Sequence, residues 1–278
     1  MKRFSLLTLL LAMFAMAMFA QSSEEAVPTR VNLGVSYGLI FPDEKETNLP
    51  KLLSREANVA TAEYLSWHLD VTSEFFFCNE RFSLATGVRL VSHSAMVENG
   101  WHNFYWLVKE SATTNDYISL NALGQRNLYV GIPLAMRVFF APYQCRVRPY
   151  VKVDASFDFK VATNNTVSII NSRMATLYER DVLEAVGKPD VFHPSISASG
   201  GIRIRCHHFY VNPEVIFPRF ELGKSPVSFI DLDEMRVGGG LKVSFQFPVG
   251  PSGEKVTKVE STYDTDIQTE KAMPTEDF

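Results

Sequence analysis

The sequence predicts an all-β protein, an eight-stranded antiparallel up-and-down transmembrane β-barrel. Three observations lead to this prediction. Apolar and polar residues alternate in eight segments, as in strands that have two different faces. The connections between these segments are short and long in strict alternation. After residue 20, no apolar run approaches the ~18 residues that a membrane-spanning helix needs, so a membrane location requires a barrel.

The composition excludes several other classes of protein. Hydrophobic residues make up 46% and charged residues 21% of the 278 residues, which is typical of a folded chain. The formal net charge of −4 argues against a protein that binds nucleic acid. The three cysteines have no C-x-x-C spacing, which argues against a zinc ribbon and against a disulfide scaffold.

Residues 1–20 have the pattern of a secretory signal peptide. Lys2 and Arg3 form a short basic region, and the apolar stretch from Phe4 to Phe19 follows them. Cleavage is expected near Ala20, with Ala15-Met16-Ala17 as an alternative site. An N-terminal membrane anchor is the other interpretation, but the stretch is short and small residues crowd its end. The exported chain then has a barrel domain over 21–250.

The two clearest strands are predicted at 127–140 and 147–161. In the first, alternate residues from Leu128 to Phe140 are all apolar. In the second, one face is apolar, and the other carries Arg148, Tyr150, Lys152, Asp154, Ser156, Asp158 and Lys160. The same period of two predicts the other six strands. These are 31–39, 67–77, 82–90, 195–205, 209–217 and 236–247.

The connections decide the topology. Short connections are expected at Cys78–Arg81, Ala141–Arg146 and Arg205–His208. Long connections are expected at 42–63, 94–126, 162–193 and 218–235. Outer-membrane barrels have short periplasmic turns and longer extracellular loops. With eight strands, both termini lie on the side of the short turns, in the periplasm.

Alternation alone does not say which face points outward, and a water-soluble lipocalin-like barrel is the alternative. Aromatic residues lie near both ends of the apolar face, as in the two girdles of a membrane barrel. They are Phe77, Phe82, Phe140, Phe209 and Phe247 at the short-turn end, and Tyr37, Phe41, Trp67, Phe159 and Phe217 at the other. Most strand glycines fall on the polar face, which suits a crowded interior. The apolar face is therefore predicted to contact lipid.

The polar face then lines the lumen, and its charges must pair because an eight-stranded barrel has little space for water. We predict a network of ion pairs that fills the lumen and leaves no open pore. Its members are Asp70, Glu74, Arg89, Arg137, Arg148, Lys152, Asp154, Asp158, Arg203, Glu214, Arg236 and Lys242. If Asn79 and Glu80 form a two-residue turn, paired residues have numbers that sum to 159, which places Asp70 opposite Arg89.

Three stretches resemble the outer-membrane barrel families of Bacteroidota. Tyr129-Val-Gly-Ile-Pro-Leu-Ala-Met-Arg is similar to their strand YLEIPLLLKY. Arg148-Pro-Tyr-Val, ending in Asp158-Phe-Lys-Val-Ala-Thr-Asn-Asn, resembles the following strand RPYVxxG…DLASN. Asn212-Pro-Glu-Val-Ile-Phe with Glu221-Leu-Gly is similar to the strand PEIRYSxGL of PorT-like proteins. The resemblance covers roughly residues 30–247. The chain departs from the pattern at Gly131, where an acidic residue is usual, and at Asp154, where glycine is common.

The PorT-like resemblance implies an outer-membrane accessory of the type IX secretion system, or a relative with another role. The alternative function is a structural or adhesion-type barrel without a transport task. Neither function needs an enzymatic site or a cofactor, and none is expected. The expected partners are outer-membrane lipid and secretion-system proteins, and the barrel is expected to be a monomer.

Several other features are open to more than one interpretation. His68 and His93 would lie near the loop end of adjacent strands, but nothing fixes a nucleophile or carboxylate beside them, so a hydrolytic site is not favoured. His207 and His208 fall in a solvated turn. Cys78, Cys145 and Cys206 lie at the short turns, and a Cys145–Cys206 disulfide remains open.

In the long loops, Ser168 to Val186 has a weak helical period. The aromatic residues Trp101, Phe104, Tyr105 and Trp106 form a partner surface or pack over the barrel mouth. Residues 251–278, with three Lys against seven Asp or Glu, are expected to form an acidic disordered periplasmic tail.

Overall fold

The computed structural model describes residues 31–54, 60–78, 80–98, 104–109, 116–230 and 239–249. The expected signal peptide over 1–20 and the expected acidic tail over 251–278 lie outside the described residues, as do Trp101 and Arg236.

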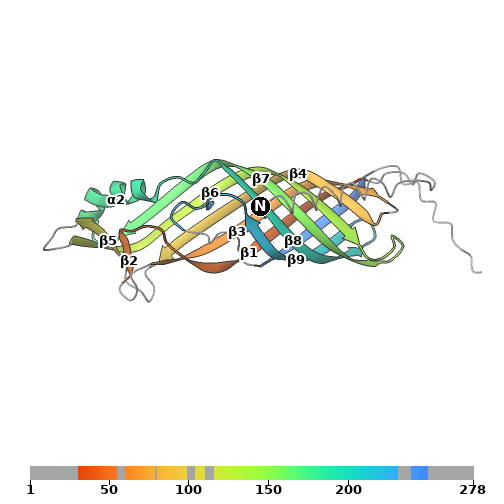
Figure 1. The fold of residues 1–278 in the computed structure, drawn as a ribbon, viewed down its shortest axis with the longest axis horizontal. Coiled ribbons are helices and arrows are strands. Elements are labelled where there is room, and N and C mark those ends of the chain that lie inside the picture. The colour runs from red at the N-terminus through yellow and green to blue at the C-terminus, as the bar shows by residue number, and fades with distance from the viewer. Residues whose placement is uncertain are drawn as a thin grey trace, which may run out of the picture.

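Among the described residues, eight long antiparallel strands close into a barrel (Figure 1). Each barrel strand pairs with the next one along the chain, and the last pairs with the first. The strands are β1 (Val31–Glu46), β3 (Thr61–Phe77), β4 (Phe82–Glu98), β6 (Asp116–Phe139), β7 (Val147–Ile169), β8 (Phe192–Arg205), β9 (Tyr210–Glu221) and β10 (Gly240–Val249). This is an up-and-down barrel, so the predicted fold class is confirmed.

The barrel is apolar on the outside and polar on the inside. On β3, Val71 is 56% exposed while its neighbour Asp70 is fully buried; on β6, Ile132 is 55% exposed and Arg137 is 4% exposed. Soluble monomers rarely expose apolar patches larger than a few hundred Å², whereas here the exposed apolar residues come from all eight barrel strands. Because such a surface suits hydrocarbon and every barrel strand is paired on both sides, the barrel is a transmembrane one.

The outward-facing apolar residues form a band around the barrel. The strand segments that carry this band are taken as the membrane-spanning segments, and they are 31–41, 67–77, 82–91, 128–140, 147–161, 192–204, 211–217 and 241–249. Exposed aromatic residues lie at both edges. Phe140 and Phe247 are at the end with the short turns, and Tyr37, Phe159 and Phe217 are at the opposite end, called here the loop end. This arrangement matches the two aromatic girdles of membrane barrels.

Several strands continue past the apolar band on the loop side. β3 begins at Thr61, β4 ends at Glu98, β6 begins at Asp116 and β7 ends at Ile169. The prediction of loops over 42–63, 94–126, 162–193 and 218–235 is therefore wrong in part. Outside the bilayer, an outward-facing residue can be polar, so the period of two disappears from the sequence while the backbone hydrogen bonds continue.

The loop end is closed by an apolar cap. Two short strands, β2 (Leu52–Ser54) and β5 (Phe104–Lys109), pair with each other, and β5 also pairs with β6. Phe104 and Trp106 are 5% and 3% exposed within the buried apolar cluster, so these two aromatic residues pack into the protein. The weak helical period over Ser168–Val186 corresponds for most of its length to α2 (Ser172–Val186), while Ser168 still belongs to β7. The helix contacts β7 and buries Val182 and Val186. No helix within the described residues is long and apolar enough to cross a membrane.

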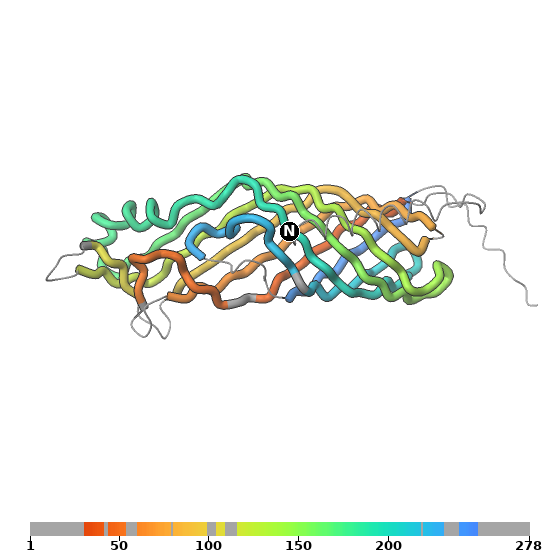
Figure 2. Tube along the Cα trace, in the orientation of Figure 1, coloured from red at the N-terminus to blue at the C-terminus, as the bar shows by residue number. Residues whose placement is uncertain are grey.

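The segment after β9, blue in Figure 2, completes the cap. Its residues Val227, Phe229 and Ile230 are fully buried in the same apolar cluster. On β6, Gln125 accepts a hydrogen bond from the Ser228 amide (2.7 Å), and Asn127 donates to the Pro226 carbonyl (2.8 Å). After β1, the Asn48 amide donates to the Phe229 carbonyl (2.9 Å). Because these partners come from strands that are not neighbours in the ring, the segment crosses the barrel mouth.

Candidate functional site

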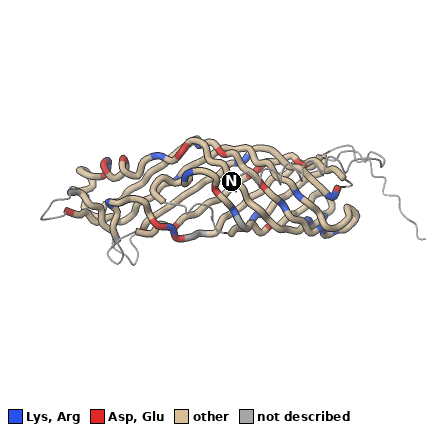
Figure 3. Tube along the Cα trace, in the orientation of Figure 1, with Lys and Arg blue, Asp and Glu red and all other residues tan. Residues whose placement is uncertain are grey.

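The lumen holds the densest group of charged side chains in the described part of the chain. Alternate residues of every barrel strand point inward, and the charged ones lie along the barrel rather than at its ends alone (Figure 3). Nine of them join into one ion-pair network, and each is at most 5% exposed. The nine, called the lumen network, are Asp70, Glu74, Arg89, Arg137, Lys152, Asp154, Arg203, Glu214 and Lys242.

Asp70 anchors one side of the lumen network. Its Oδ1 lies 2.7 Å from Arg89 Nε, and Arg89 Nη2 lies 3.0 Å from Asp154 Oδ2. Lys242 of β10 and Ser36 of β1 both donate to Asp70 Oδ2. Asp70 therefore ties together residues of four strands.

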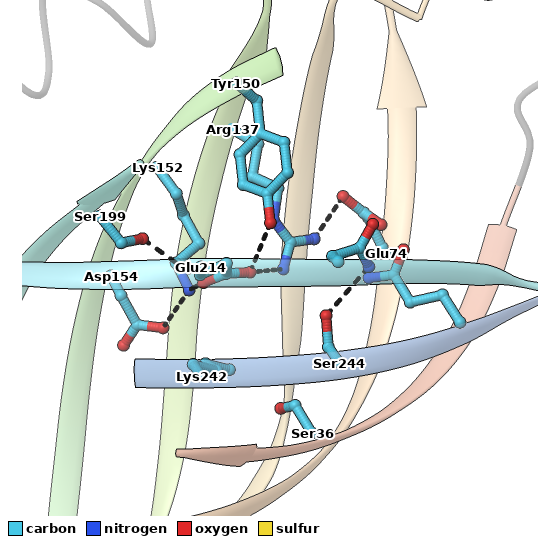
Figure 4. Close-up of polar contacts among 12 residues, drawn as sticks. Ser36, Glu74, Arg137, Tyr150, Lys152, Asp154, Ser199, Glu214, Lys242 and Ser244 are labelled. Carbon is cyan, nitrogen blue, oxygen red and sulfur yellow. Dashed lines mark hydrogen bonds and ion pairs between the residues drawn. The ribbon is translucent and has the colours of Figure 1, made fainter. Parts of the chain in front are cut away.

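Glu214 and Glu74 anchor the other side, where Arg137 joins them (Figure 4). Arg137 Nη1 lies 2.6 Å from Glu74 Oε1, and Arg137 Nη2 lies 3.2 Å from Glu214 Oε1. Lys152 donates to Glu214 and lies 4.0 Å from Asp154, which connects the two sides. Arg203 Nη2 lies 2.6 Å from Glu74 Oε2. With Ser36, all eight barrel strands contribute a member or a partner of the lumen network.

The lumen network contains five cations and four carboxylates, and each cation has at least one carboxylate within 4.0 Å. A buried charge that loses its partner is strongly destabilised, so these groups hold one another in place. These charged side chains fill the middle of the barrel, and the apolar cap fills its loop end. The arrangement can brace the barrel, because its ion pairs cross the lumen between strands that are not neighbours in the ring.

The remaining predicted members of the network lie apart from it. Arg148 is at the short-turn end, where it donates to the Glu80 carbonyl and lies 3.9 Å from Glu80 Oε2. Asp158 is fully buried and accepts a hydrogen bond from Ser156 (2.6 Å), but it has no ion pair with any residue in the described part of the chain. Arg236 lies outside the described residues.

A second polar cluster lies between the lumen network and the cap, and the alternation of the strands did not predict it. His193 Nε2 lies 2.7 Å from Glu221 Oε2, and Arg219 Nε lies 2.8 Å from Glu221 Oε1. Burial opposes ionisation of Glu221, but Arg219 and His193 hold the pKa of this carboxyl below its usual range. Arg219 and Glu221 fall where a loop was predicted. Strict alternation past the outward-facing Phe217 would have placed both of them outside, but the register shifts between the Ser199–Ile216 and Ser197–Arg219 pairs and turns them inward.

Apart from His193, the described histidines and cysteines belong to no evident catalytic or metal site. His68 and His93 are buried and face inward, as predicted, and Tyr64 OH lies 2.7 Å from His93 Nδ1. Burial raises the pKa of Tyr64, which lies beyond the apolar band. His207 and His208 are exposed. Cys78, Cys145 and Cys206 are free thiols, so the Cys145–Cys206 disulfide is not formed. The described residues hold no group of three or more His, Cys, Asp or Glu that could bind a metal ion.

Comparisons with known proteins add one distant similarity. No model of a known protein family matches the chain, and no curated protein sequence matches it. Among solved structures, the chain is similar to Ail, the attachment invasion locus protein of Yersinia pestis, crystallised with the heparin analogue sucrose octasulfate. The TM-score is 0.26 and the identity is 7%, over 80% of this chain and 97% of Ail. The strand pairing and the apolar exterior, rather than this likeness, define the fold.

Proposed function

We propose that this chain is an outer-membrane protein that serves as an accessory in protein secretion, of the PorT-like type IX kind. In this proposal it binds partners through its loop end and its periplasmic rim, transports no solute and catalyses no reaction. The observation that carries the proposal is the filled interior: the lumen network lies across the barrel, and the apolar cap closes the loop end.

The location follows from the kind of barrel. Closed antiparallel barrels with an apolar exterior and aromatic girdles are typical of bacterial outer membranes. The signal peptide expected at residues 1–20 supports export of the chain to that membrane. In this orientation the short turns face the periplasm, and the loop end, with α2 and the cap, faces outward.

The secretion role rests on the resemblance to PorT-like proteins. Its motifs fall on β6, β7 and β9, within segments that also supply Arg137, Arg148 and Glu214 to the interior. A barrel without a pore can act only through its surfaces. An accessory that binds other secretion proteins needs only such binding surfaces. The structural or adhesion-type barrel is the competing function, and the protruding loop end with α2 is the feature that favours it.

The test is deletion of the gene in the parent strain, followed by measurement of secreted proteins that carry type IX sorting domains and of small-solute uptake. We expect secretion to fall and uptake to stay unchanged. Native-membrane crosslinking should recover secretion components with the barrel. Secretion equal to that of the parent strain, with the barrel confirmed absent, would favour the structural or adhesion-type function. Liposome swelling by the purified protein at porin-like rates would overturn both functions, because swelling requires an open lumen.

A further inference from the structure

Two of the three cysteines lie on neighbouring strands at the short-turn end of the barrel. Cys145 lies two residues before the start of β7, and Cys206 directly follows the end of β8. These two strands are antiparallel, and Val147 of β7 is paired with Ile204 of β8. When this register is continued by two residues on each strand, Cys145 comes to lie opposite Cys206.

A backbone hydrogen bond continues the ladder past Val147. The Arg205 amide donates to the Arg146 carbonyl oxygen (2.8 Å), so these two arginines form a hydrogen-bonded pair. Hydrogen-bonded and non-hydrogen-bonded pairs alternate along an antiparallel ladder, so the next pair, Cys145 and Cys206, is of the non-hydrogen-bonded kind. Pairs of this kind have Cα atoms about 4.5 Å apart. This separation falls within the range of roughly 4.4–6.8 Å over which a disulfide joins two cysteines.

The turn that carries Cys145 is held against the ends of β8 and β9 by side chains. Arg205 Nη2 donates to the Tyr143 carbonyl oxygen, and Arg205 Cζ lies 4.3 Å from the centre of the Tyr143 ring. The hydroxyl groups of Tyr143 and Tyr210 are 3.3 Å apart. Because Arg205 directly precedes Cys206, these contacts keep the two segments that carry the cysteines side by side.

The two cysteines share one face of the sheet, and they are accessible. By the period of two, Cys145 belongs to the same face as Val147, and Cys206 belongs to the same face as Ile204. Val147 is 47% exposed, so this face is the outer one. Cys145 is exposed and Cys206 is half-buried, and both are thiols in the structure. A protein in the periplasm can therefore reach this pair of residues at the end of the barrel.

We propose that Cys145 and Cys206 form a modification site, a dithiol that is oxidised to an intramolecular disulfide after export. The periplasm is an oxidising compartment in which disulfides form and persist. The disulfide would join β7 to β8 at the point where their backbone hydrogen bonds end. This inference goes beyond the proposed function, on which it rests only for the periplasmic location of the short turns.

The oxidant is the reactive disulfide of a periplasmic thiol oxidase. The thiolate of one cysteine attacks a sulfur atom of this disulfide, which forms a mixed disulfide and releases one thiol of the oxidase. The second cysteine then attacks the sulfur atom of the first, and the oxidase leaves as a dithiol. One S–S bond is formed and one is broken, and two electrons and two protons pass from this chain to the oxidase.

Cys78 provides an internal control. It lies in the turn between β3 and β4, where the register of these strands places Arg81 opposite it. In the ring, β4 and β6 lie between β3 and β7. The register thus pairs Cys145 with Cys206 and gives Cys78 no cysteine opposite it, so we expect Cys78 to stay reduced.

The test uses the full-length protein from native outer membranes, lysed with N-ethylmaleimide and without reductant. Peptide mapping should find a Cys145–Cys206 linkage and one alkylated cysteine per chain, Cys78. Cys145→Ser and Cys206→Ser should each give two alkylated cysteines, whereas Cys78→Ser, the matched control, should give none and retain the linkage. Three alkylated cysteines in the native protein would overturn the inference. So would a disulfide that involves Cys78 or a second copy of the chain.

A second measurement does not depend on the oxidase of the host. The purified protein is reduced in detergent micelles and then treated with oxidised glutathione. We expect Cys145 and Cys206 to lose two hydrogen atoms together without retaining glutathione, while Cys78 retains the glutathione adduct. Adducts retained on both Cys145 and Cys206 would show that the two thiols do not meet, which would overturn the inference. Unboiled gel migration checks that each variant is folded. Thiol mapping is independent of the secretion measurement, so either proposal can fail alone.

Discussion

Asp70 of β3 and Arg89 of β4 are directly opposite each other in the barrel wall, and Arg89 Nε lies 2.7 Å from Asp70 Oδ1. Their pairing extends across the barrel, because Arg89 also contacts Asp154 of β7 and Asp70 also accepts from Lys242 of β10. A local pair in one hairpin thus connects strands that are far apart in the ring.

Removal of the Asp70 carboxylate should destabilise the barrel. Asp70→Asn leaves Arg89 and Lys242 buried without this partner, which should lower the free energy of unfolding by on the order of 3 kcal/mol. Urea unfolding in detergent micelles measures the change. The control is Asp190→Asn, which breaks the exposed pair with Lys224 at 3.9 Å and should change stability by less than about 0.5 kcal/mol. Equal effects of both substitutions would contradict the bracing role of the lumen network.

A charge placed on the apolar band should be costly because it contacts hydrocarbon. Ile132→Arg, in the middle of the band, should destabilise the inserted barrel by about 2–4 kcal/mol. Thr61→Arg, at an exposed position beyond the band, should have little effect. Refolding into lipid vesicles followed by unfolding in denaturant measures both. If the two arginines cost the same, the outer surface does not face a bilayer.

The interior is too crowded for an extra methyl group beside Gly131. A Cβ at this position would lie 1.9 Å from Asp158 Oδ1 and 2.8 Å from the Phe157 carbonyl oxygen. Gly131→Ala should therefore cost about 1–3 kcal/mol through overpacking. Gly200→Ala is the matched control, because nothing lies within 4 Å of its added Cβ. Thermal unfolding of the two variants in the same detergent separates crowding from the general effect of replacing glycine.

The Glu221 cluster should make stability depend on pH. Because the folded state lowers the pKa of Glu221 below the usual value of 4.5, the ionised carboxyl contributes stability above that pH, and the contribution is lost as the pH falls below it. Glu221→Gln should therefore be less stable than the parent protein at pH 7, and the difference should shrink towards pH 3. Hydrogen exchange of the β8 and β9 amides at several pH values measures this. A difference that stays constant would show that the carboxyl is not ionised in the fold.

The sequence was most informative where each strand separates two different environments. Within the apolar band, outward-facing residues such as Val71 must be apolar and inward-facing residues such as Asp70 must be polar. The alternation therefore fixed both face and register, and the predicted sum of 159 for paired residues is confirmed by Asp70 and Arg89. The same reasoning correctly predicted that charged residues on the polar face of each strand line the lumen.

Beyond the band this information disappears. Tyr64 and Val97 face an apolar cap instead of a polar lumen, while residues on the outside meet water. Inward-facing residues are therefore no longer polar there, and outward-facing residues are no longer apolar. Long-range packing of Trp106 and Phe229 in one cluster depends on where two loops meet, which no local pattern encodes. Arg219 and Glu221 were missed because a register shift after Ile216 moves them to the inward-facing side, whereas a strict period of two assigns them to the outward-facing side of Phe217.

The order in which the lumen charges enter along the chain affects how such a barrel can be built. Of the lumen network, the first six barrel strands carry four cations, Arg89, Arg137, Lys152 and Arg203, and three carboxylates, Asp70, Glu74 and Asp154. The carboxylate that Arg137 and Lys152 share, Glu214, comes with the seventh strand, and Lys242 comes with the eighth. The last hairpin thus leaves the excess of cations unchanged, but it gives Arg137 a second carboxylate partner and Lys152 a closer one than Asp154. The ion pairs of Arg137 and Lys152 are therefore complete only in the closed barrel, so closure by the C-terminal hairpin stabilises charges that the earlier strands have already buried.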